Sequence, residues 1–163
     1  MSIVSRKSRY ALHGLAFIAV SSQGKPVPYN KILEYLRAYS QNLSLSTGYI
    51  AKVFQELSRA GFTAAVSGPH GGYQLARPAG RISLIDVVEA LDGPLLTGCC
   101  LLSVGDCPKQ STCGVRTIIQ EAELAFYRFF QRETVATLAR RMDFPVPTGP
   151  PRPRKPPVRP RRR

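Results

Sequence analysis

The sequence predicts a mainly α-helical protein with one small β-hairpin, and three observations lead to this fold class. Apolar residues recur at helical spacing through most of residues 5–61, with breaks at GKPVP and YSQNLS. Two strand-like runs, FTAAVS and YQLAR, then flank the turn sequence GPHGG. A long helical run, VRTIIQEAELAFYRFF, lies further along. With 163 residues and 44% hydrophobic content, the chain is expected to form one domain with a substantial core.

The first two predicted helices each carry an apolar face. The first starts near Ser5 or Ser8, either of which can cap it, and runs to about Gln23. Its apolar stripe consists of Leu12, Leu15, Ala16, Ala19 and Val20. The second starts near Tyr29, and its apolar face consists of Ile32, Leu33, Tyr35 and Leu36. This spacing predicts that both helices pack against a common core.

The third predicted helix has clear start and stop signals. Ser46 is a suitable N-cap, and Gly61 stands where a left-handed C-cap residue belongs. Its apolar face consists of Ile50, Val53, Phe54 and Leu57. Its exposed side consists of Thr47, Gly48, Ala51, Lys52, Gln55 and Arg59. Two helices, a break and a third helix with a small, polar N-terminal face form the pattern of a helix-turn-helix.

The predicted hairpin directly follows this third helix, as a wing would. Gly71 and Gly72 are expected to allow positive φ at its tip and a close approach of backbone to phosphate. The wing and the excess of basic residues favour DNA binding over an ordinary helical core. No Ser/His/Asp set, P-loop or paired acids in a recognisable setting are present, so no enzyme class finds support.

The C-terminal half of the body is expected to be helical as well. Ser83 and Asp86 resemble a capping box for a short helix that ends at Asp92. In the long helix one apolar seam consists of Ile118, Ala122, Ala125 and Phe129, with Ile119 and Phe126 beside it. This seam can pack on its own domain or pair with a second copy of the chain. Thr134 is expected to cap a final short helix, VATLARR.

All four cysteines lie within the stretch CCLLSVGDCPKQSTC, residues 99–113. The N-terminal apolar run is too short to span a bilayer, and no clear cleavage motif follows it, so a cytoplasmic protein is expected. Structural disulfides are rare there, so clustered cysteines indicate metal or redox chemistry. Thiolates are the usual ligands of iron–sulfur clusters, and a loop broken by Gly and Pro can turn several sulfurs inward. Structural zinc fits less well, because the stretch has no Cys-x-x-Cys pair.

Positive charge is concentrated at the C-terminus. The chain has 23 Lys and Arg against 10 Asp and Glu. Seven of these basic residues, no acids and eight of the 14 prolines lie in residues 145–163. Proline excludes helix and central strand, so a disordered, polyproline-II-like tail is expected over residues 143–163. Such a tail is either a solubilising extension or a sequence-independent grip on phosphates.

The run GYIAKVFQELSRAGFTAAVSGPHGGYQLARPAGRISLIDVVEALDGPL resembles the winged-helix transcription regulators of the IscR, NsrR and RirA type (the Rrf-two family). The opening RYALHGLAFIA and the closing ETVATLA extend the resemblance over residues 1 to about 142. It implies a winged helix-turn-helix domain with its opening helix (1–80), then a linker helix, a cysteine loop and a dimerisation helix (81–142). It also implies a homodimer that binds a near-palindromic site in double-stranded DNA.

Several members of that family hold an iron–sulfur cluster through three cysteines just before the long helix. The resemblance carries these positions to Cys100, Cys107 and Cys113, with Cys99 as rival for the first or as a fourth ligand. The histidine that is the fourth ligand in IscR is replaced by Arg116, and the aspartate that serves in NsrR is replaced by Arg9. The remaining candidates for that place are Cys99, Asp106, Glu121, a small thiol or no ligand at all. A [2Fe–2S] and a [4Fe–4S] cluster therefore both stay open.

The predicted DNA contacts fall into two groups. Base edges would be read by Thr47, Tyr49, Ala51 and Lys52, with a bond from Tyr49 to a phosphate as the alternative for that residue. The backbone would be positioned mainly by Ser46, Arg59, His70, Gly71, Gly72, Tyr73 and Arg77. The family commonly has an arginine just before the wing glycine, where this chain has Ser67.

Three functions follow from these patterns. The first is a transcription regulator that senses redox, iron or nitric-oxide status through the cluster. The second is a cluster-free regulator switched by a disulfide between two of the four cysteines. The third is an iron–sulfur or interaction protein that does not bind DNA.

Overall fold

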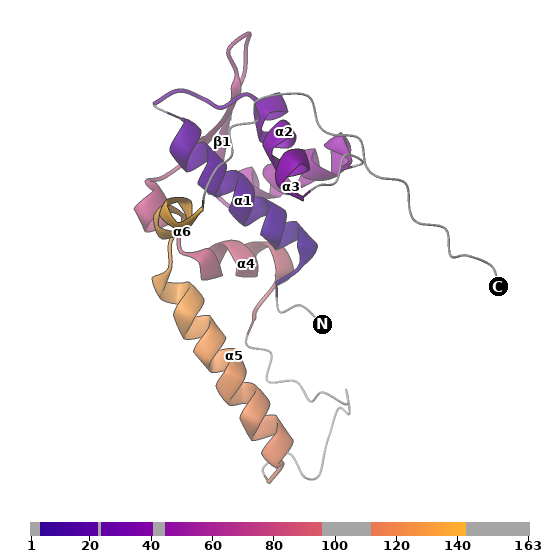
Figure 1. The fold of residues 1–163 in the computed structure, drawn as a ribbon, viewed down its shortest axis with the longest axis vertical. Coiled ribbons are helices and arrows are strands. Elements are labelled where there is room, and N and C mark those ends of the chain that lie inside the picture. The colour runs from indigo at the N-terminus through magenta and orange to yellow at the C-terminus, as the bar shows by residue number, and fades with distance from the viewer. Residues whose placement is uncertain (1–3, 23, 41–44, 96–111, 143–163) are drawn as a thin grey trace, which may run out of the picture.

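The computed structural model describes residues 4–22, 24–40, 45–95 and 112–142. The predicted fold class is confirmed: the chain is mainly helical, with one antiparallel pair of strands (Figure 1). The elements in order are α1 (Arg6–Ser21), α2 (Tyr29–Ser40), α3 (Thr47–Arg59), β1 (Thr63–Val66), β2 (Gly72–Leu75), the 3-10 turn η1 (Ala79–Arg81), α4 (Leu84–Asp92), α5 (Gly114–Arg132) and α6 (Val135–Arg141). No helix in the described ranges is long and apolar enough to cross a membrane.

Most helix starts use the caps that the sequence indicates. The Ser5 hydroxyl accepts from the Ser8 amide, and the Ser46 hydroxyl accepts from the Tyr49 amide. Thr134 forms a reciprocal capping box at α6. At α4, Ser83 is the N-cap as predicted, but its hydroxyl accepts from the Ile85 amide and not from Asp86, as a capping box would require. The same hydroxyl donates to the Phe130 and Gln131 carbonyls. This cap therefore also fixes α4 to the end of α5.

The core forms around α1, which packs against α2, α3, α4, α6 and β2. The predicted apolar faces of α2 and α3 are buried. In α4 the buried residues are Leu84, Ile85, Val87, Val88 and Leu91. One prediction for α1 was wrong: Val20 is 50% exposed, whereas Ile18 is fully buried. The buried stripe of α1 runs through Ala11, Leu15 and Ile18, and Val20 lies outside it.

The hairpin is anchored to the chain segment before α2. Strands β1 and β2 pair from Thr63–Leu75 to Val66–Gly72. Tyr73 makes a second pairing on its other side, in which it exchanges two backbone hydrogen bonds of 2.8 and 2.9 Å with Val27. This bridge ties the hairpin to the helical core.

The backbone of the hairpin turn differs from the prediction at one glycine. Gly72 has a positive φ of 158° as expected, but Gly71 does not, and Gly68 takes that role at 113°. A Cβ on Gly71 would meet the Val66 carbonyl oxygen, so Gly71 is needed for the tightness of the turn. A Cβ on Gly72 would meet the Val27 carbonyl oxygen. Both close approaches are therefore made within the protein.

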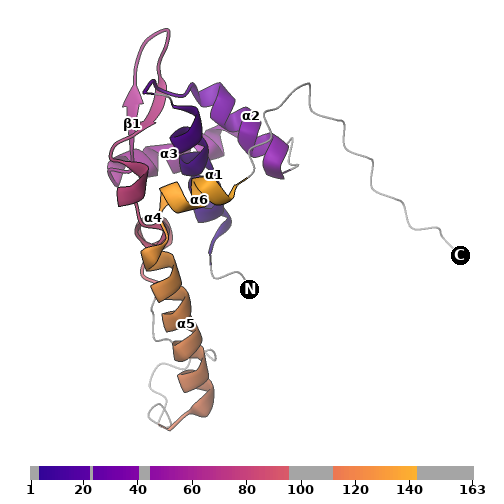
Figure 2. The same ribbon diagram turned by 60° about the vertical axis from the view of Figure 1, so that its left-hand side comes forward.

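Helix α5 extends away from the body, at the end opposite to the hairpin (Figures 1 and 2). None of its residues, all of which the structure describes, is buried. Its base is fixed where Phe126 and Phe130 pack against the core and where backbone hydrogen bonds join Leu84 to Glu133 and Val135 to Ile82. The predicted seam is open to solvent in the single chain, with Ile118 67% and Phe129 42% exposed.

Candidate nucleic-acid interface and cysteine site

The start of α3 is held by two residues of α2. The Arg37 guanidinium donates to the Leu45 carbonyl at 3.0 and 3.3 Å and to the Thr47 hydroxyl at 3.3 Å. The Tyr29 hydroxyl donates to the Thr47 carbonyl at 2.6 Å. These bonds bridge the ends of the 41–44 segment and fix the direction in which α3 begins. Sequence reasoning missed both residues, and the only signal was a basic residue in the last turn of α2.

The N-terminal part of α3 presents the residues predicted to read bases. Thr47, Tyr49 and Lys52 are exposed, and the Ala51 side chain between them is half-buried. The Tyr49 ring meets the Tyr10 ring of α1 edge to face, with centroids 6.2 Å apart. Since the Thr47 hydroxyl is already bonded to Arg37, Lys52 and Tyr49 are the polar side chains of this set for which the structure gives no competing hydrogen bond.

The other face of α3 is anchored in the protein. Lys7 of α1 forms an ion pair of 3.1 Å with Glu56. Arg59 lies exposed in the last turn. The position of α3 is therefore set by α1 at both its beginning, through Tyr10, and its second half, through Lys7.

The residues predicted on the wing divide into packed and exposed ones. Tyr73 packs against Phe54 with ring centroids 4.9 Å apart, and burial raises the pKa of its hydroxyl. His70 is exposed in the turn, and the Arg77 guanidinium lies over the Phe62 ring at 4.9 Å. Tyr73 thus supports the wing from inside, whereas His70 and Arg77 lie on its surface.

The segment leading to the cysteines starts beside α1. The Asp92 carboxylate accepts from the Ser5 amide at 3.1 Å and from the Ser5 hydroxyl at 2.7 Å. Gly93 ends α4 with a φ of 86°, and the Leu95 amide donates to the Glu89 carboxylate. The described chain stops there and resumes at residue 112. Its exit from α4 is therefore bonded directly to the cap of α1.

Of the four cysteines, Cys113 is the one inside the described ranges, and it is a half-buried free thiol at the N-cap of α5. Cys99, Cys100, Cys107 and Asp106 lie outside these ranges. Among the described residues, no group of three or more His, Cys, Asp and Glu side chains could hold a metal ion. Arg116 is half-buried in the first turn of α5, and Arg9 is exposed on α1. Glu121 lies exposed further along α5.

Comparisons with known proteins agree on one group. The model of the family Rrf2, described as an iron-dependent transcriptional regulator, matches residues 4–141. Protein rrf2 of Nitratidesulfovibrio vulgaris is 34% identical over 84% of this chain and 87% of that protein. The HTH-type transcriptional regulator IscR of Vibrio vulnificus is 33% identical over 83% of this chain and 76% of that protein. The oxidised form of Staphylococcus aureus CymR superposes with a TM-score of 0.65 at 25% identity, covering 88% of this chain and 99% of that structure.

Proposed function

Because the chain belongs to the Rrf2 family of transcriptional regulators, we propose that it is a cytoplasmic, homodimeric DNA-binding regulator that senses its signal through a cysteine-ligated iron–sulfur cluster. One observation carries the sensing part of this proposal. All four cysteines lie in fifteen consecutive residues that lead directly into α5, in a chain whose family is described as iron-dependent. Clustered thiolates suit iron, and the chain has no cysteine outside this stretch.

The DNA contacts are proposed for the exposed side of α3 and the surface of the wing. Lys52 can donate to guanine acceptors in the major groove, and Tyr49 can bond a base edge or a phosphate. Arg59, His70 and Arg77 would neutralise or position phosphates. The bonds from Arg37 and Tyr29 hold the start of α3, and with it the reading side chains, in place against α2. Hydrogen bonds to base edges require fixed side-chain positions, because a displaced donor can no longer reach its acceptor on the base.

The dimer is proposed to form through α5. This helix protrudes, has no buried residue of its own, and exposes Ile118 and Phe129 on one seam. Solvent-exposed apolar residues in a continuous row are typical of an interaction surface. A second copy of α5 would bury this seam and place two α3 helices for successive major grooves of a near-palindromic site.

The cluster ligands are proposed as Cys100, Cys107 and Cys113, with Cys99 as rival or fourth ligand. A cluster held by thiolates is anionic, and the N-terminus of α5, where Cys113 lies, favours negative charge. Neither Arg9 nor Arg116 can ligate iron, so these two family positions cannot supply the fourth ligand. When bound, the cluster would supply a redox-sensitive cross-link within residues 99–113. The residues of the chain itself would pass a shift of this segment on through Asp92 and Ser5 to α1, and from α1 to α3.

The direct test of the cluster is anaerobic purification of the full chain, followed by an absorption spectrum and iron and sulfide analysis. We expect coloured protein that loses its colour in Cys107→Ala or Cys113→Ala. Cys100→Ser should bleach it, and Cys99→Ser should retain most of it. Loss of colour in both serine variants would indicate that Cys99 is the fourth ligand. Loss of colour in Cys99→Ser alone would indicate that Cys99, and not Cys100, is the first ligand.

A colourless wild type with almost no iron after anaerobic reconstitution would overturn the cluster and favour the thiol switch. That second candidate is supported by the structural similarity to an oxidised form of CymR. A disulfide between two of the four cysteines would then form on mild oxidation. Mass spectrometry after alkylation would identify which pair it joins.

DNA binding is tested on an operator enriched by selection from random duplexes, with a random duplex as reference. Lys52→Ala should lower the ratio of the two affinities, at a cost of about 1–3 kcal/mol for the operator. Deletion of residues 145–163 should weaken the affinity for both duplexes alike. It should also reduce the slope of log affinity against log salt concentration by up to about 0.9 per lost phosphate contact. An unchanged ratio in Lys52→Ala would remove Lys52 from the base-reading set. An unchanged salt slope would leave the tail as a solubilising extension.

A further inference from the structure

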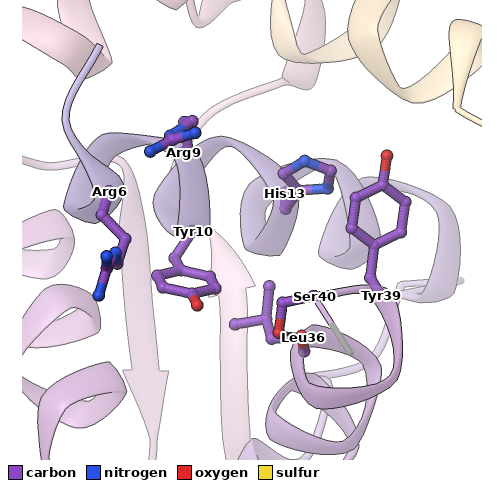
Figure 3. Close-up of a pocket in the computed structure, with 7 residues that line it drawn as sticks. All are labelled: Arg6, Arg9, Tyr10, His13, Leu36, Tyr39 and Ser40. Atoms are coloured by element: carbon purple, nitrogen blue, oxygen red, sulfur yellow. Dashed lines mark hydrogen bonds between the residues drawn. The ribbon is translucent and has the colours of Figure 1, made fainter. Parts of the chain in front are cut away.

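A cavity of about 250 Å³ lies between the first half of α1 and the C-terminal end of α2. Figure 3 shows Arg6 and Arg9 on one side of it and Tyr39 on the other, with Tyr10 and His13 between them. Pockets for drug-sized molecules measure about 300–1,000 Å³. This cavity is therefore sized for a molecule of one or two rings.

The charge of the lining selects an anion. Arg6 and Arg9 are one turn apart on α1, and no acidic residue of the described ranges lines the cavity. In the described part of the chain neither guanidinium has a carboxylate partner, whereas Lys7 next to them is paired with Glu56. A guanidinium fork matches the two oxygens of a carboxylate, and such charge-assisted hydrogen bonds are the strong ones.

The remaining walls suit a flat apolar body. Tyr10 and Tyr39 present aromatic rings, and Leu36 contributes an aliphatic surface. The His13 ring lies 4.2 Å from the Tyr39 ring and its Nδ1 is 3.3 Å from the Tyr35 hydroxyl oxygen. Burial lowers the pKa of His13 and so favours the neutral form of its ring in this wall.

We propose that this cavity binds a small aromatic carboxylate, with Arg6 and Arg9 holding the carboxylate and Tyr10 and Tyr39 holding the ring. The cavity also lies close to α3, since the ring of Tyr10, which lines it, contacts the ring of Tyr49 at the start of that helix. A ligand stacked on Tyr10 would therefore change DNA affinity. This second effect rests on the proposed function, whereas binding itself does not.

The test uses full-length protein without DNA, with benzoate, salicylate and indole-3-carboxylate as probes in saturation-transfer NMR and calorimetry. We expect saturable binding of at least one probe. The double variant Arg6→Gln/Arg9→Gln should weaken it by about 10- to 100-fold, because the charged donors are lost. Arg81→Gln, which changes an exposed arginine in η1, is the matched control and should bind as the wild type does. Benzamide, which has the ring without the charge, should bind at least about tenfold more weakly.

Several results would overturn the proposal. One is the absence of saturable binding of every probe to folded wild type. Another is equal affinity in the double variant, and a third is inorganic phosphate binding as tightly as the aromatic probes, which would make the ring walls irrelevant. Loss of DNA affinity in the double variant without any probe binding would assign the arginines to DNA phosphates instead. Circular dichroism and thermal unfolding establish that each variant is folded, and His13→Gln offers a second, uncharged perturbation that should also weaken binding.

Discussion

Replacement of Gly72 by alanine tests whether the wing glycine serves the protein or the DNA. Gly72 has a φ of 158°, which side chains rarely adopt. A Cβ there would meet the Val27 carbonyl oxygen and lie 2.5 Å from its carbon and 2.8 Å from the Pro28 nitrogen. All three are backbone atoms, which cannot rotate away as a flexible side chain can. The added methyl group must therefore push the second strand away from Val27.

The cost follows from two contributions. Backbone strain at a glycine-only conformation costs about 1–3 kcal/mol. Each of the two hydrogen bonds between Val27 and Tyr73 contributes about 0.5–1.5 kcal/mol, and the shift weakens one or both. We therefore expect the free energy of unfolding to fall by about 2–5 kcal/mol, a large part of the roughly 5–15 kcal/mol of an ordinary domain.

Urea unfolding of the free protein, without DNA, measures this change. Gly80→Ala is the matched control, because a Cβ on Gly80 meets nothing within 4 Å and its φ is not positive. It should cost less than about 1 kcal/mol. Equal costs in the two variants would refute the structural role of Gly72. Weaker DNA binding with unchanged stability would instead show that Gly72 is needed for phosphate approach.

Variants at three further sites, Arg37, Gly14 and His13, test other contacts. Arg37→Ala should lower the free energy of unfolding by about 1–2 kcal/mol. Arg37→Lys should lower it nearly as much, because lysine lacks the forked group that reaches both the Leu45 carbonyl and the Thr47 hydroxyl. A lysine variant as stable as the wild type would contradict this. Gly14→Ala should cost about 1–3 kcal/mol in urea unfolding, because its Cβ would lie 2.6 Å from Phe54 Cζ, and a loss below about 0.5 kcal/mol would show that the ring moves freely. Because the pKa of His13 is lowered in the folded protein, the unfolded chain binds the His13 proton more tightly, and the free energy of unfolding should fall as the pH drops below 6.5. His13→Asn should reduce this pH dependence, whereas the control His70→Asn, at an exposed histidine, should leave it as in the wild type.

Local patterns in the sequence predicted the helices well. The spacing of Ile50, Val53, Phe54 and Leu57 identified the buried face of α3, and Ser46 identified its start. Such features depend on neighbours within one or two turns, which is why they can be read from a single sequence. The same spacing identified the apolar seam of α5, but it left open whether this seam packs on its own domain or on a second copy of the chain.

Contacts between distant segments were not predictable in this way. The close approach of Gly72 to Val27 and the bonds from Arg37 to Leu45 and Thr47 depend on how separate elements meet in space. The contact of the Tyr73 ring with Phe54 is of the same kind, since it joins the second strand to the third helix. Periodicity determines which face of an element is buried, and it says nothing of which residue lies opposite.

The hub position of α1 gives the proposed sensor a physical route to the DNA-reading helix. At its start, Ser5 is bonded to Asp92, the last residue of α4 before the cysteine segment. Further along the same helix, Tyr10 contacts Tyr49, and Lys7 is paired with Glu56, so α1 contacts both the beginning and the second half of α3. Closely packed helices move as rigid bodies rather than deforming, so a shift at the start of α1 must displace its contacts with α3. A coupling free energy of about 1–3 kcal/mol between two sites changes affinity by about 5- to 150-fold. A coupling of this size between the cysteine segment and α3 would therefore be sufficient to regulate DNA binding.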